Sequence, residues 1–157
     1  MKWFFVLILV IKLNGQAVEV SAVVHSVISG FQISYAMKDR MAFKNGNVKY
    51  KQYQKVWRLL LPLEYLSAGV VGFCIAIENK EKMNWLRIAT DVIEAGLIRV
   101  NVRQWVYQVN NGRNIFNNPN SENTFFPKWE KWADANVKII ALGLVILFKY
   151  LIIDKIL

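Results

Sequence analysis

The sequence has very few of the residues that usually build metal sites and disulfide frameworks. Among 157 residues it contains one cysteine, Cys74, and one histidine, His25. A lone cysteine excludes an intramolecular disulfide, and one histidine with one distant cysteine supplies too few zinc ligands without carboxylates. Glycine-rich phosphate loops, zinc-protease motifs and nucleophile elbows are also absent from the sequence. We therefore expect no metal and no cofactor, and catalysis has no support in the sequence.

Acidic residues are scarce relative to basic ones. The chain has 20 Lys and Arg against 11 Asp and Glu, a formal net charge of +9. That excess suits nucleic acid and an anionic membrane surface equally well. The bases flank apolar runs and no nucleic-acid-binding signature accompanies them, which favours the membrane. We expect a bilayer with anionic headgroups as partner, with a second copy or another membrane protein as a further partner and no nucleic acid.

Apolar residues are abundant and gathered in blocks. They make up 55% of the chain, and segments 3–13, 59–77 and 139–153 are nearly free of charge. The blocks are long, poor in proline and spaced as in helices, so strands are not expected. The sequence predicts an all-α fold, a small polytopic transmembrane bundle of three to four helices. The alternative is a soluble protein in which these runs are buried core helices.

The N-terminal segment 1–17 is close to a secretory signal peptide in pattern. Lys2 precedes a short apolar run, and Gly15 and Ala17 are small residues at the positions that a signal peptidase reads. Lys12 departs from the pattern, and a retained short hydrophobic helix is the alternative. Residues 18–157 are expected to form a single helical membrane domain.

Segment 17–37 is predicted to be a helix with a polar stripe. The residues that recur along one face are Ser21, His25, Ser29, Gln32 and Ala36. In lipid such a stripe faces another helix, with Ser21 and Ser29 permitting close packing. For His25 two interpretations stay open: a hydrogen bond across a helix contact, or a proton shuttle or base paired with a carboxylate.

Segment 38–58 carries seven Lys and Arg against a single acid, Asp39. Its Asn45-Gly46-Asn47 sequence predicts a turn. A short loop this basic is typical of the cytoplasmic side of a membrane protein. The high Asn, Lys and Ile content is that of an AT-rich genome, so we expect a bacterial or phage-encoded protein of the cytoplasmic membrane.

Segment 59–77 is the clearest predicted span, with Pro62 expected in its first turn. Its one charge is Glu64, which is either a boundary partner of Arg58 or a functional carboxylate for ion or proton passage. Small residues at four-residue steps predict a helix-packing face: Ala68, Gly72 and Ala76.

Segment 84–109 is predicted to be a helix that carries the densest charged set of the chain. Its apolar face comprises Leu86, Ala89, Ile93, Leu97 and Val100. The charged set on its other faces comprises Asp91, Glu94, Arg99 and Arg103. The set forms either a solvated or interfacial face, or a buried network with Glu64 or His25 that lines a polar cavity.

The C-terminal third combines a predicted loop at 110–124 with a last helix at 135–153. Between them, Phe126, Trp129 and Trp132 are expected to be interfacial anchors. Lys149 interrupts the last apolar run near its end, where a long side chain can snorkel to the surface.

Three functions are compatible with these patterns. The first is a structural, scaffold or accessory role in a membrane. The second is a pore-forming, holin-like or transport element that uses intramembrane charges such as Glu64 and the charged set. The third, less expected because no catalytic motif is present, is a membrane-embedded enzyme that uses His25 with a carboxylate.

Overall fold

The computed structural model describes residues 17–80, 84–116 and 135–153, and this part of the chain is helical without strands. Its elements are α2 (Ala17–Lys44), α3 (Tyr50–Glu78), α4 (Trp85–Asn110), α5 (Ala135–Phe148) and a closing π-helical turn, η2 (Lys149–Ile153). The predicted all-α fold is confirmed. The predicted N-terminal segment before Ala17 and the anchors Phe126, Trp129 and Trp132 lie outside the described residues.

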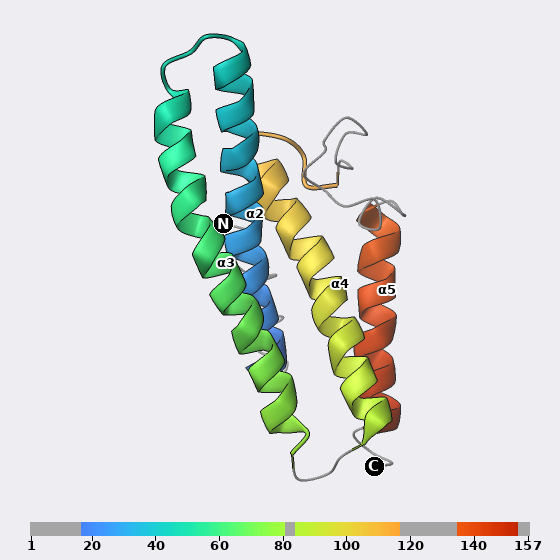
Figure 1. The fold of residues 1–157 in the computed structure, drawn as a ribbon. Helices are drawn as coiled ribbons and strands as arrows, with labels where there is room; N and C mark the ends of the chain where they lie inside the picture. The colour runs from blue at the N-terminus through green and yellow to red at the C-terminus, as the bar shows by residue number, and fades with distance from the viewer. Residues whose placement is uncertain (1–16, 81–83, 117–134, 154–157) are drawn as a thin grey trace.

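The helices follow one another as a row in the order α3, α2, α4, α5 (Figure 1). Helix α2 packs against both α3 and α4, and α4 in turn packs against α5. The α2–α3 hairpin extends past the neighbouring end of α4 (Figure 1). Polar groups buried in this arrangement therefore lie at the seams between successive helices.

The basic segment 38–58 is mostly helix and not a loop. Helix α2 continues to Lys44 and α3 begins at Tyr50, so only a short turn separates them. Lys, Arg, Ala and Met are good helix formers, and the segment has no proline to stop a helix. The Asn45-Gly46-Asn47 turn is where the sequence predicts it, and Gly46 adopts a φ of 65° that favours glycine.

Helix α3 begins well before the predicted span 59–77, which it contains. Pro62 therefore lies inside the helix, whereas the sequence predicted it in the first turn. The reason is again the basic segment, whose helix runs without a break into the apolar one. Proline at this position removes one backbone hydrogen bond, and its side chain faces outward.

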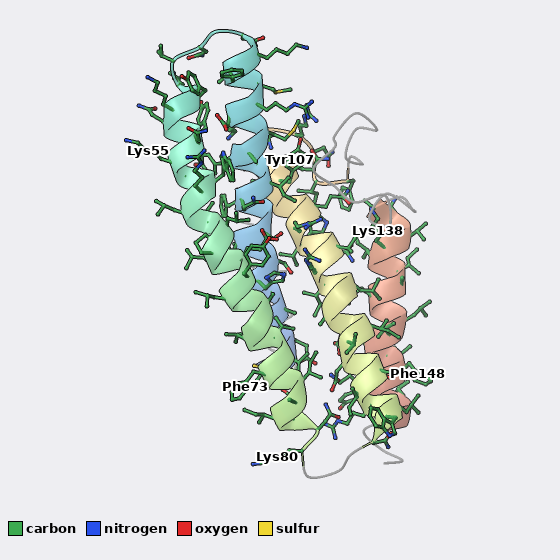
Figure 2. All side chains as sticks on the ribbon, viewed as in Figure 1. Lys55, Phe73, Lys80, Tyr107, Lys138 and Phe148 are labelled. Atoms are coloured by element: carbon green, nitrogen blue, oxygen red, sulfur yellow. The ribbon has the colours of Figure 1, made fainter. Side chains whose placement is uncertain are left out.

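The distribution of polar and apolar side chains is inverted relative to a water-soluble bundle. Among the described residues, buried polar and charged side chains are as numerous as buried apolar ones. Large apolar side chains cover the outside, as Phe73 and Phe148 illustrate (Figure 2). On α4 the apolar residues Leu86 and Ile93 of the predicted face are exposed, whereas Glu94 is buried.

Candidate functional site: two buried polar clusters

The most densely charged site surrounds the ammonium group of Lys149. Its Nζ lies 2.9 Å from Glu19 Oε1, 2.9 Å from Asp91 Oδ1 and 2.8 Å from Glu94 Oε2. Asn79 Nδ2 donates a hydrogen bond of 2.8 Å to Asp91 Oδ2. We call these five residues the Lys149 cluster. Asp91, Glu94, Asn79 and Lys149 are all buried.

Four helical ends bring the Lys149 cluster together at one end of the fold. Glu19 is in the first turn of α2, and Asn79 is the C-cap of α3. Asp91 and Glu94 lie in the first turns of α4, and Lys149 opens the π-helical turn η2 after α5. The Asn84 side chain caps α4 by accepting from the backbone N–H groups of the residues two and three positions later.

A second polar site lies nearer the middle of α2 and α3. Ser29 Oγ donates to Glu64 Oε1 at 2.6 Å, and Arg103 Nη1 donates to Ser29 Oγ at 3.2 Å. Arg99 Nη2 lies 3.7 Å from Glu64 Oε1. We call Ser29, Glu64, Arg99 and Arg103 the Glu64 cluster. It joins three helices, α2, α3 and α4.

Glu64 has an ion-pair partner other than the predicted one. Arg58, expected to reach it along α3, instead lies with its guanidinium 5.7 Å from the centre of the Trp57 ring. Arg99 on α4 is the described partner. Arg58 is exposed on α3, and its guanidinium lies over the ring of the neighbouring Trp57. This cation–π contact replaces the predicted ion pair with the half-buried carboxylate further along the helix.

His25 contacts a hydroxyl group and not a carboxylate. Its Nδ1 lies 3.0 Å from Ser67 Oγ, and Ser67 Oγ donates to the backbone oxygen of Glu64 at 2.9 Å. Because the single hydroxyl hydrogen is used in the second bond, Nδ1 of His25 acts as the donor to Ser67. This is the geometry of a hydrogen bond that joins α2 to α3. The described contacts of His25 lack the carboxylate that a base of the predicted kind would need.

The predicted packing residues divide into those that meet another helix and those that do not. Ser29 joins the Glu64 cluster, whereas Ser21 donates to the backbone of its own helix at Val18. Next to Ser29, a Cβ at Gly30 would lie 2.6 Å from Val106 Cβ, so α2 and α4 touch there. The predicted face of α3 is exposed within this chain: Ala68, Gly72 and Ala76.

The charged set of α4 is divided between the two clusters. Asp91 and Glu94 pair with Lys149, and Arg99 and Arg103 belong to the Glu64 cluster. The solvated-face interpretation does not hold for Asp91, Glu94 and Arg103, because all three are buried. The acids and bases lie about two turns apart on α4, which keeps them from pairing with one another.

Sequence reasoning missed two buried lysines, one near each end of the last helical segment. Lys149 was expected to snorkel, yet its side chain is 4% exposed and points into the protein. Lys138, fully buried at the start of α5, donates from Nζ to Gln104 Oε1 at 3.1 Å (Figure 2). The two lysines are eleven positions apart, close to three helical turns, so they share one face. That spacing could have indicated a polar seam.

Other proteins add no information about this arrangement. Within the described residues no group of three or more His, Cys, Asp or Glu is placed to hold a metal ion. No protein-family model, curated protein or solved structure matches the chain. The geometry of the two clusters and the surface around them are therefore the features of the chain that bear on its function.

Proposed function

We propose that the chain is a small integral membrane protein with a structural or accessory role, and that buried polar contacts hold its helices together in the bilayer. The inverted distribution of side chains carries this proposal. Helices in hydrocarbon gain little from burying apolar side chains against each other, so hydrogen bonds and close packing hold them together. The Lys149 and Glu64 clusters and the Gly30 contact supply both.

The lengths of the helices support a polytopic arrangement. Helices α2 and α3 are long and apolar enough to cross a membrane, and none of the apolar stretch of α3 is buried inside the protein. The core helix of a soluble protein would be mostly buried. Helix α5 has 14 residues and η2 has 5. Together they are about 28 Å long, close to the thickness of a hydrocarbon core of ~30 Å. Helix α4 then crosses the membrane with its buried charged side chains facing α2 and η2.

The basic hairpin supports an orientation with residues 38–58 in the cytoplasm. Lys44, Lys49 and Lys51 are exposed around its turn. The hairpin extends past α4, where anionic headgroups would meet it (Figure 1). The Lys149 cluster then lies near the opposite surface of the membrane.

Extraction and proteolysis test both parts of the proposal. We expect the full chain to stay in the membrane pellet after a carbonate wash and to be released only by detergent. Trypsin should cut the hairpin at the lysines near Gly46 in inside-out vesicles and spare it in right-side-out vesicles. Release by carbonate would overturn the membrane assignment, and cleavage in right-side-out vesicles alone would overturn the orientation.

A second candidate function is proton or ion passage, and the Lys149 cluster is the observation that favours it. Ionisable side chains buried in membrane helices commonly mark ion or proton pathways. In proteoliposomes, wild-type protein should then dissipate a pH gradient faster than Glu94→Gln. Equal rates for wild type, Glu94→Gln and empty vesicles would leave the structural role as the proposed function.

A further inference from the structure

We propose that the Lys149 cluster binds one exchangeable proton, and that Glu94 carries it. The inference goes beyond both candidate functions, because a proton can bind at this site whether or not it crosses the membrane. It rests on three properties of the site: the ratio of acids to bases, the burial of the groups, and the unequal number of donors that each carboxylate receives.

Acids outnumber bases around Lys149. Three carboxylates lie within 2.9 Å of the ammonium group of Lys149, and within the described part of the chain two negative charges have no further counter-charge in direct contact. The other described charged groups at this end do not remove the excess. Glu78, whose Oε1 accepts from the Val18 backbone N–H, adds one acid, and half-buried Arg87 on α4 adds one base. Lys80 is exposed.

The burial of the cluster makes this excess costly. The side chains of Asp91, Glu94 and Lys149 are 0%, 2% and 4% exposed. An uncompensated carboxylate in a poorly solvated site is destabilised strongly, and neutralisation by a proton is the usual outcome. When carboxylates share a site, one of them is the first to take up the proton.

The hydrogen-bond donors and the side-chain exposure together identify Glu94 as that carboxylate. Asp91 Oδ2 accepts from the Asn79 amide, in addition to the contact of Oδ1 with Lys149. Glu19, like Glu94, has Lys149 as its one described donor, but its side chain is 16% exposed against 2% for Glu94. Glu94 has Lys149 as its one described donor. The ionised form of Glu94 is therefore the least stabilised of the three.

Surplus acceptors at the same site point independently to a missing hydrogen. Asn79 is 4% exposed, and its Oδ1 accepts no hydrogen bond from a described residue although its Nδ2 is bound to Asp91. Glu19 Oε2 is likewise buried and accepts from no residue that the structure describes. A proton adds the O–H donor that such a site lacks. It comes from water and forms one O–H bond on Glu94, which changes the charge of the three carboxylates and Lys149 from −2 to −1.

Infrared difference spectroscopy on the full chain in lipid bilayers tests the proposal. A protonated carboxyl group has a C=O stretching band that an ionised carboxylate lacks, and the band shifts in heavy water when the proton exchanges. We expect such a band near neutral pH in wild type, its loss at higher pH, and its absence in Glu94→Gln. Glu64→Gln is the matched control, because Glu64 has Arg99 and Ser29 as partners and should not contribute.

Isotope labelling gives a result that does not depend on the folding of any variant. Labelling all glutamates with carbon-13 at the side-chain carboxyl should shift the band, whereas the same label on aspartate should not. No carboxylic band at neutral pH, or a band that shifts only with the aspartate label, overturns the assignment. A band that disappears when sodium replaces choline at constant pH would overturn it too, because an alkali cation would then be the ligand.

Discussion

The two polar clusters join the same helices in different ways. At the Glu64 cluster the helices touch, because Gly30 lets Val106 approach α2 and the short Ser29 side chain lies between Glu64 and Arg103. At the Lys149 cluster long charged side chains bridge helical ends, with Lys149 reaching acids on α2 and α4. One seam depends on shape and hydroxyl groups, and the other depends on charge.

The clusters also carry opposite charge balances. The Glu64 cluster has two guanidinium groups and one carboxylate, whereas the Lys149 cluster has three carboxylates and one ammonium group. The Glu64 cluster lies near the middle of α2 and α3, and the Lys149 cluster lies at the helical ends opposite the α2–α3 turn. The excess of buried acids is therefore found at the end of the fold away from the basic segment 38–58.

The largest expected effect comes from removing Lys149, the one base among the described residues that contacts the three carboxylates directly. Lys149→Met should lower the free energy of unfolding by about 3–5 kcal/mol, because it leaves buried carboxylates without their counter-charge. The measurement is reversible unfolding in mixed lipid–detergent micelles. Lys80→Met, an exposed lysine at the same end, is the control and should change little.

A second substitution separates charge from packing in this result. If charge is the cause, Asp91→Asn in the Lys149→Met background should cost much less than Asp91→Asn alone, since the Lys149–Asp91 pair is already broken. Equal losses for Lys149→Met and Lys80→Met would contradict the idea that charge holds this seam together.

The sequence predicted the positions of the helices well, but it predicted poorly which face of each helix is buried. Periodicity and the scarcity of proline predicted all four helices, and the Asn45-Gly46-Asn47 signal predicted the turn. Helix ends were misplaced wherever charged residues continued a helix, as in segment 38–58, because charge reports exposure and not backbone conformation. The same pattern that identifies a helix also assumes that its apolar face is buried, but on α4 Leu86 and Ile93 of that face are exposed while Val100 is buried.

Residues of the candidate site could be named from the sequence, but not their partners. His25, Glu64 and Glu94 stood out as ionisable groups within or beside apolar segments. Lys149 did not, because a lysine near a helix end can either snorkel or turn inward, and the choice depends on acids more than fifty residues away. Such long-range pairs depend on which helices pack against one another, and the periodicity of a single helix carries no information about that.

An effect of intermediate size is expected at the close contact between α2 and α4 at Gly30. Gly30→Ala should lower the free energy of unfolding by about 1–3 kcal/mol, since the added methyl group would overlap Val106 and the Arg103 backbone oxygen. Gly72→Ala is the matched control, because a Cβ there meets no atom within 4 Å. The measurement is again unfolding in micelles. If Gly72→Ala proves the more damaging, its face of α3 packs against another chain, as the small-residue pattern predicts.

The smallest effect is expected at the residue that looked most like a catalytic group. His25→Ala should cost about 0.6 kcal/mol, the average for a polar side-chain contact between membrane helices, because His25 loses one bond to Ser67. In a double-mutant cycle with Ser67→Ala the coupling energy should account for most of that loss. The described contacts of the His25 ring include a hydroxyl group and no carboxylate, so the Glu64 cluster should keep its geometry without His25. A loss as large as that of Lys149→Met would contradict this ranking and make His25 a second charged centre of the fold.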